Sequence, residues 1–273
     1  GIGGTGVVGL LEGAAPGRGI GVRADMDALP ITEQSRVPFP SQVPGRMHAC
    51  GHDVHTVIAL GVAQVMSALG SRLSGGLKFI FQPAEETLSG AAAMIADGVL
   101  EDPPMDAILG YHNWPLMRTG CVGYHSGAVM ASSDAFDITL TGKAGHAAHP
   151  HTGIDALLGA AQLINALQTV ISREIAPAIP AVLTVGQIEG GVARNVIPDR
   201  VVLRGTARTL DAGAARQVET SVRRITAGVC SSMRLEHEIT WKRQAPVLQN
   251  DAGTLAGVLA SARDVLGAAQ VLD

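Results

Sequence analysis

The segment Gly19-Ile20-Gly21-Val22-Arg23-Ala24-Asp25-Met26-Asp27-Ala28-Leu29-Pro30 is a largely apolar run that leads into two carboxylates and a proline. Its first six residues predict a short strand, so Asp25 and Asp27 lie at the carboxyl end of that strand. Open α/β sheets usually carry their sites at this edge. We therefore expect an α/β domain with a polar site just beyond residue 24.

Two later strands are expected to end in the same way. Residues 77–81 predict a buried strand that reaches Glu85 and Glu86, and residues 107–110 predict one that ends at His112. Three successive strands thus bring polar residues to their carboxyl ends, as a shared site requires. Further elements expected in this region are a strand over 7–11, a helix from Asp53 whose apolar residues recur in near-helical register, and a helix over 91–95.

The pattern changes near residue 132. Strands are predicted over 136–141, 181–188, 201–209 and 235–241, and helices over 155–171 and 211–229. This strand–helix–strand–strand–helix–strand order is that of the split βαβ, ferredoxin-like arrangement. The residues expected on the buried face of its first helix are Leu157, Ala161, Ile164, Leu167 and Ile171.

The fold class is therefore α/β with two domains. A larger, mixed-sheet α/β/α domain is expected over 1–130 and 244–273, including a helix over 253–266. A smaller α+β (ferredoxin-like) domain over 131–243 is inserted into it.

Composition narrows the classes of function. Of 273 residues, 47% are hydrophobic and only 3% aromatic, and the net charge is −4 without any block of like charge. This balance gives no sign of a nucleic-acid or anionic-membrane partner, and no apolar run reaches the ~18 residues that a membrane span needs. The three cysteines fit a reduced, cytoplasmic setting better than a disulfide framework. Cys121 and Cys230 are interpreted as buried small hydrophobic residues.

A metal site is predicted at the start of the helix that follows residue 52. His48, Cys50, His52 and His55 crowd into one short segment, and imidazole and thiolate are the preferred ligands of borderline divalent metals. Cys50 and His52 alternate in an extended loop, and His52 and His55 are one helical turn apart, so each pair can share a face. The alternative is a helix N-terminus with a buried cysteine and capping histidines; the clustering favours metal.

Glu85 and Glu86 follow a proline at a strand end, where neighbouring side chains are expected to point to different sides. One carboxylate can then bind a metal while the other takes a proton from water, whose pKa a metal lowers toward ~7, and passes it to a leaving nitrogen. Alone, the pair would be a solvated acidic pair at a helix start. Its position between the Cys/His cluster and His112 favours a role in metal binding and catalysis over a solvated acidic pair. Asp27 is interpreted as a residue that orients a ligating histidine, with a ligand or a turn residue as alternatives.

Other candidates lie in the second domain. His146, His149 and His151 stand in a segment without an acidic residue, and Pro150 breaks any helical spacing. A donor to a developing oxyanion is therefore favoured over a second metal site. Asn195 and Arg208 can hold a substrate carboxylate by charge-assisted hydrogen bonds; the alternatives are an ordinary turn Asn and a surface Arg.

Five segments, 24–30, 48–55, 81–86, 145–151 and 195–199, resemble one family in order and spacing. It is the metal-dependent amidohydrolase and metallopeptidase family of hippurate hydrolase, auxin-conjugate hydrolases, N-acyl-amino-acid deacylases and N-acetyldiaminopimelate deacetylase. The resemblance covers almost the whole chain. It implies a catalytic domain over 1–130 and 244–273 and a lid and dimerisation domain over 131–243.

The resemblance also implies roles for single residues. Glu85 matches the general base, and Asp27 matches an aspartate that supports the site, whereas Asp25 stands where related peptidases often have a ligating His. The thiolate is expected to be shared between two metals. The positions that match the family's metal ligands are Cys50, His52, Glu86 and His112.

For the second domain, the resemblance implies that His146 reaches the active site of the partner subunit and steadies the oxyanion. Asn195 and Arg208 match residues that grip the substrate's carboxylate or oxyanion. The family's last ligand, a C-terminal His, has no match, because the last histidine, His237, falls in a second-domain strand. We expect a chain cut at both ends, a site short of one ligand, and low activity of this polypeptide.

The function expected is hydrolysis of the amide between an acyl group and an amino acid by a cytoplasmic homodimer. Two divalent metals per subunit are expected, Mn or Zn, with Co or Ni as further options. The alternatives are a dipeptidase or carboxypeptidase of the same family, or a catalytically impaired metal-binding relative. A purely structural scaffold leaves the Cys/His/Glu arrangement unexplained.

Overall fold

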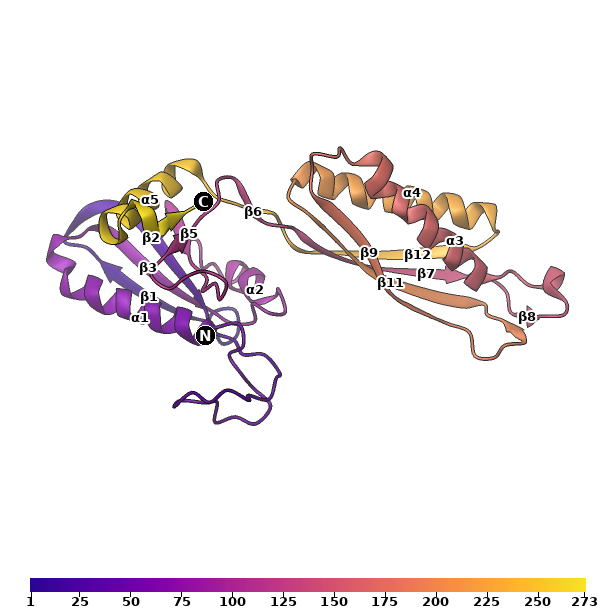
Figure 1. Cartoon of the computed structure of the whole chain (residues 1–273), viewed down its shortest axis with the longest axis horizontal. Coiled ribbons are helices and arrows are strands. Elements are labelled where there is room, and N and C mark those ends of the chain that lie inside the picture. Colours follow the sequence, from indigo (N-terminus) through magenta and orange to yellow (C-terminus); the bar gives the residue numbers. More distant parts are fainter. The chain divides into compact units, whose positions relative to one another are not determined.

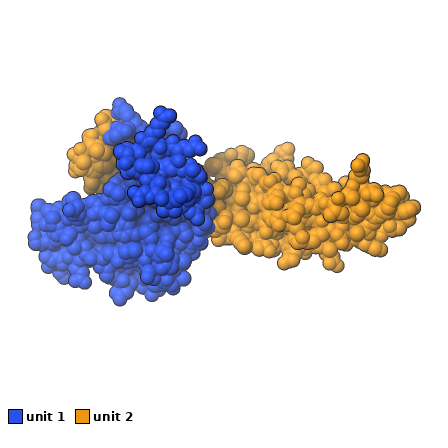
Figure 2. All heavy atoms as spheres, turned by 90° about the horizontal axis from the view of Figure 1, so that it is seen from below, with its two compact units in different colours: residues 1–120 blue, residues 121–273 orange.

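The computed structural model describes residues 1–273, which form two compact units, Gly1–Gly120 and Cys121–Asp273 (Figure 2). None of the helices is long and apolar enough to span a bilayer. The predicted boundary near residue 130, and the return of residues 244–273 to the first domain, stay predictions.

A four-stranded mixed sheet forms the centre of the first unit (Figure 1). Strand β2 lies between β3 and β4 and runs parallel to both, while β1 pairs antiparallel with the outer side of β3. The carboxyl ends of β2, β3 and β4 therefore meet at one edge of the sheet, as the sequence predicted. The strands are β1 (Val7–Glu12), β2 (Ala15–Asp25), β3 (Ser74–Gln82) and β4 (Ala107–Gly110).

Helices α1 (His52–Ala68) and α2 (Gly90–Ala96) cover opposite faces of this sheet. Side chains alternate along β3, so Phe79 and Phe81 pack with Ala59 of α1, whereas Ile80 packs with Met94 of α2. The unit is thus an α/β/α sandwich, as predicted, with a small apolar cluster on each face.

Helix α1 begins where it was predicted, but the apolar residues that predicted it do not form its buried face. Val57 is 67% exposed and Val65 is 59% exposed, whereas His52, His55 and Ala59 are buried against the sheet. The buried face therefore starts with two imidazoles, which α1 carries to the carboxyl edge of β2.

The second unit contains a four-stranded antiparallel sheet with the order β12-β7-β11-β9. Counted along the chain, this order is fourth, first, third and second, which confirms the predicted split βαβ arrangement. Helices α3 and α4 pack on one face of the sheet around a single large apolar core. The elements are β7 (Ser133–Thr141), α3 (Ala156–Thr169), β9 (Ala181–Gly190), β11 (Arg200–Thr209), α4 (Ala212–Ser232) and β12 (Glu236–Ala245).

The predicted buried face of α3 is partly wrong. Leu167 is buried as predicted, but Leu157 is 42% exposed, and the helix also buries Ala156, Ala160 and Leu163, which were not predicted. The helix is apolar on most of its circumference, so periodicity alone did not choose between adjacent stripes. The start of the helix is fixed by Asp155, whose carboxylate accepts the N–H groups of residues 157 and 158, each at 2.9 Å.

Short elements complete the second unit. Strand β5 pairs in parallel with β14, β6 pairs antiparallel with β13, and β8 pairs antiparallel with β10. Cys230 is buried as predicted, whereas Cys121 is only half-buried. The bounds are β5 (Val122–Gly123), β6 (Ala128–Met130), β8 (Gly145–His146), β10 (Val196–Ile197), β13 (Leu248–Gln249), α5 (Ala252–Leu266) and β14 (Val271–Leu272).

Candidate metal centre

Side chains that can bind metal gather where β2, β3 and β4 end and α1 begins. Within each of three overlapping groups the potential ligand atoms lie within 4.8 Å of one another. All of these residues belong to the first unit. The groups are Cys50 with His52 and His112, His52 with Glu85 and Glu86, and Asp25 with His52 and His55.

His52 is the common member of these groups, and its ring is fully buried. Its Nδ1 lies 3.0 Å from the carbonyl oxygen of Asp27 and 3.1 Å from the Oδ1 of the same residue. Both atoms accept hydrogen bonds, so Nδ1 carries the hydrogen and Nε2 keeps a lone pair. Nε2 has no hydrogen-bond partner although it is buried. A buried nitrogen left without a partner is costly, whereas a metal ligand needs this tautomer and this open lone pair.

Three carboxylates lie near the lone pair of His52, because Oδ2 of Asp25 is 3.6 Å from Nε2 and the two glutamates are slightly further away. Nε2 lies 4.0 Å from Oε2 of Glu85 and 4.0 Å from Oε1 of Glu86. Asp27 contacts both His52 and Glu86, because its second carboxylate oxygen accepts the backbone N–H of Glu86 at 3.0 Å. The geometry thus supports the predicted orienting role of Asp27.

The two glutamates do not point to different sides as expected. Strand β3 ends at Gln82, and the chain then turns through Ala84, which has a positive φ of 51°. Side-chain alternation no longer applies beyond the strand, and both carboxylates approach His52. Burial raises the pKa of Glu85, the negative charges of Asp25 and Glu86 raise it further, and Arg23 opposes this shift.

Cys50 and His112 form the other side of the centre. The Sγ of Cys50 lies 3.5 Å from Nε2 of His112, close to the separation of about 3.6 Å that two ligands of one tetrahedral zinc have. The Nδ1–H of His112 donates to the carbonyl of Asn113 at 2.7 Å, which leaves Nε2 with its lone pair. Burial, followed by the charge of Glu86, raises the pKa of Cys50 to about 11. Nearby cationic charge is therefore needed to hold the thiolate at neutral pH.

Asp25 and His55 already have hydrogen-bond partners in this structure, and His48 lies apart from the three groups. Asp25 is almost fully buried, and its Oδ2 accepts from Nη1 of Arg23 at 2.8 Å. Burial acts to raise the pKa of Asp25, but the hydrogen bond from His55 and the charge of Arg23 outweigh burial and lower it. Both ring nitrogens of His55 have partners. His48 is exposed and belongs to none of the three groups.

Comparison with known proteins fits this geometry. The model of peptidase family M20/M25/M40 matches residues 21–273. The chain belongs to this family. It is 44% identical over 247 residues to N-acetyl-L-cysteine deacetylase of Bacillus subtilis, which covers 90% of this chain and 59% of that protein. It is 41% identical over 251 residues to N-acyl-L-amino acid amidohydrolase of Geobacillus stearothermophilus, covering 91% of this chain and 67% of that one.

Among solved structures, this M20 chain is similar to the YXEP protein of Bacillus subtilis, which is described as a dinuclear metal binding peptidase. The TM-score is 0.82 at 37% identity, over 96% of this chain and 67% of that one. The chain thus spans 59% to 67% of the length of these three relatives.

In the second unit of this M20 chain, two of the three candidate residues lie together. Strand β8 pairs with β10 so that His146 lies opposite Val196, and the N–H of Ala147 donates to the carbonyl of Asn195 at 3.0 Å. Arg208 lies eight residues beyond Arg200, about 27 Å further along β11, and is paired with Val182. Within the second unit, Arg208 is therefore not part of the β8–β10 strand pair beside which His146 and Asn195 lie.

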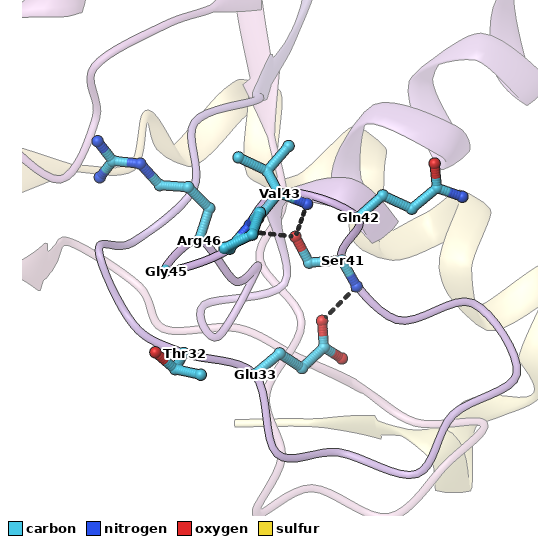
Figure 3. A pocket seen from close by; sticks show the side chains of 8 residues that line it. Thr32, Glu33, Ser41, Gln42, Val43, Gly45 and Arg46 are labelled. Carbon is cyan, nitrogen blue, oxygen red and sulfur yellow. Dashed lines mark hydrogen bonds between the residues drawn. The ribbon is translucent and has the colours of Figure 1, made fainter.

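The loop between Asp27 and Cys50 holds a small pocket that contains none of the candidate ligands (Figure 3). The carboxylate of Glu33 accepts the backbone N–H of Ser41 at 2.6 Å and the hydroxyl of Ser35. Figure 3 also shows the hydroxyl of Ser41 against Val43. Hydrogen bonds from Ser35 and Ser41 lower the pKa of Glu33. These contacts brace the loop that leads to Cys50.

Proposed function

We propose that this protein hydrolyses the amide bond of N-acyl amino acids with the help of bound divalent metal. The observation that carries the proposal is the Nε2 of His52, a buried lone pair without a partner that faces Glu85 and Glu86. The names of two relatives, a deacetylase of N-acetyl-L-cysteine and an amidohydrolase of N-acyl-L-amino acids, support this class of substrate.

Cys50, His52, Glu86 and His112 would hold the metal, with two ions per subunit. The thiolate and imidazoles suit Zn, the carboxylates suit Mn, and Co or Ni are further options. A solved relative described as dinuclear supports two ions. When bound, the metal polarises the amide carbonyl and lowers the pKa of water.

Glu85 is the proposed general base. It would take a proton from the attacking water and deliver it to the leaving amine nitrogen. Its raised pKa brings it closer to the range in which one carboxyl group can accept and then return a proton near neutral pH.

His146 is the proposed donor to the developing oxyanion. Its Nδ1 accepts the backbone N–H of Ala148 at 3.1 Å, so in the neutral ring Nε2 carries the hydrogen. This is the opposite tautomer to that of His52, and it provides a donor instead of a lone pair. Asn195 and Arg208 would hold the substrate's carboxylate or oxyanion.

The assembly is also part of the proposal. Residues 131–243 would form the lid and the interface of a homodimer, and His146 would serve the site of the partner subunit. Cys50 must stay reduced to bind metal, which favours a reducing setting such as the cytoplasm.

Two alternative functions lead to different outcomes in one assay. A dipeptidase or carboxypeptidase would prefer unblocked peptides, so a panel of hippurate, N-acetyl amino acids and dipeptides separates it from the proposed enzyme. A catalytically impaired relative would bind metal and turn over none of these substrates.

The general-base role is tested by Glu85→Gln. We expect turnover to fall by about 10²- to 10⁴-fold while the amount of metal bound stays unchanged. The matched control is Glu101→Gln, an exposed glutamate of the same unit, which should keep full turnover. Unchanged turnover in Glu85→Gln would remove Glu85 from the mechanism.

A further inference from the structure

His55 is as deeply buried as His52, yet it offers no electron pair to a metal. Its Nδ1–H donates to Oδ1 of Asp25 at 2.6 Å, and its Nε2 accepts the backbone N–H of Asn113 at 2.9 Å. A neutral imidazole has one N–H and one lone pair, and both are used here. The chain therefore buries a second histidine beside the proposed centre for a purpose other than ligation.

The partner of His55 leads directly to a proposed ligand. The carbonyl of Asn113 accepts the Nδ1–H of His112 at 2.7 Å, and this bond turns Nε2 of His112 toward Cys50. One backbone group of Asn113 is thus held by His55, and the other sets the ring of His112. Hydrogen bonds from a backbone carbonyl commonly fix the tautomer and orientation of a ligating histidine.

The side chain of Asn113 is fitted against the segment that carries Cys50. Gly51 has a φ of 88°, and a Cβ at that position would lie 2.4 Å from Oδ1 of Asn113. Only glycine avoids both the strained backbone and this collision. Asn113 is therefore enclosed between Gly51, His55 and His112.

His55 itself cannot shift easily. Asp25, its carboxylate partner, is held by Arg23 at 2.8 Å, and the hydroxyl of Thr56 donates to the carbonyl of Asp25 at 3.1 Å. The hydroxyl of Tyr111 donates to the carbonyl of His55. His55 is thus held by Asp25 at the end of β2 and by Tyr111 directly after β4.

We infer that His55 is a positioning residue: by holding Asn113, it keeps His112 oriented so that His112 and Cys50 can bind the same ion. The inference rests on the proposed metal site and gives a role to His55, which is not one of the proposed ligands. Loss of His55 frees the Asn113 N–H and lets the His112 ring turn away from Cys50.

The test is a Co²⁺ titration of the purified protein, because cobalt bound to a thiolate gives a charge-transfer band that reports whether Cys50 is a ligand. In His55→Phe we expect about 10- to 100-fold weaker Co²⁺ binding and a weakened or shifted thiolate band. In His55→Gln, whose amide can donate to Asp25 and accept from Asn113, most of the affinity and the band should return. The matched controls, His48→Phe and His48→Gln, change an exposed histidine of the same segment and should behave as the parent.

The outcomes separate this inference from the proposed function. A parent protein that binds no Co²⁺ contradicts the metal site itself. A parent with a thiolate band, and a His55→Phe protein with the same band and affinity but a lower melting temperature, contradicts only the positioning role. If His55→Phe does not fold, Gly51→Ala carries the test, because the new Cβ pushes on Asn113 directly. The same loss of band is expected there, and an unchanged band overturns the inference.

Discussion

The two units bury different kinds of side chains. The second unit has one large apolar core between its sheet and α3 and α4, and the polar residues that it buries are Asp134 and five serines and threonines. The first unit has only small apolar clusters, and it also buries Asp25, His52, His55, Lys78 and Gln82. Buried polar groups are tolerated when they have partners. Nε2 of His52 lacks one at the carboxyl edge of the sheet.

Because of this difference, we expect substitutions in the two units to affect different properties. Substitutions in the apolar core of the second unit should lower the free energy of unfolding and leave metal binding intact. Substitutions around His52 should weaken metal binding and leave the free energy of unfolding largely unchanged. A variant that lowers both the free energy of unfolding and the metal affinity would contradict this division of roles between the units.

The largest expected effect is that of Phe136→Ala in the second unit. Phe136 is 1% exposed and stacks on Trp241, with ring centroids 5.3 Å apart. Removing a buried aromatic ring should lower the free energy of unfolding by about 3–5 kcal/mol, measured by denaturant unfolding. The control is Val182→Ala, an exposed residue of the same sheet. Metal affinity of the folded protein should not change, and a parallel loss of affinity would contradict the separation of roles.

A smaller effect is expected for Asp27→Ala in the first unit. His52 loses the Oδ1 of Asp27 and keeps only the backbone carbonyl of residue 27, and the backbone N–H of Glu86 loses its partner. Metal affinity, measured by titration calorimetry, should fall about 10- to 100-fold, or about 1.4–2.8 kcal/mol. Glu101→Ala removes an equal charge from the exposed surface and should leave the affinity unchanged. Full metal affinity in Asp27→Ala would show that His52 does not need the carboxylate of Asp27 to bind metal.

The smallest effect concerns the acidity of Cys50. Burial and Glu86 raise its pKa to about 11, so the thiol of the metal-free protein is protonated at neutral pH. Metal binding must then release this proton, and apparent affinity should rise with pH by up to about tenfold per unit below that pKa. The pH dependence of affinity checks this, with Cys50→Ser as the control that should flatten the slope. Rapid alkylation of metal-free Cys50 at pH 8 would contradict the raised pKa.

Much of the site could be predicted from sequence because strands deliver residues at fixed places. Asp27, Glu86 and His112 each follow a strand by a few residues, and parallel neighbours must end at one edge. The order of elements in the second unit likewise determined its sheet order.

Other features depend on tertiary contacts that periodicity does not contain. His48 and His55 resemble His52 in the sequence, but His48 is exposed, and both ring nitrogens of His55 have partners that come from distant segments. The predicted buried faces of α1 and α3 were also partly wrong, because both helices have apolar residues on their exposed faces as well. The role of Asn113 was missed because it acts through its backbone.

We propose that the carboxyl edge of β2, β3 and β4 is a metal centre built around His52. The most direct test is a crystal structure of the protein grown with Zn²⁺ or Mn²⁺, with anomalous data collected at the absorption edge of the metal. We predict an anomalous peak about 2.0–2.1 Å from Nε2 of His52, in contact with Glu86 or Cys50. The absence of a peak at this edge of the sheet, or a peak beside His55 instead of His52, would contradict a metal centre at His52.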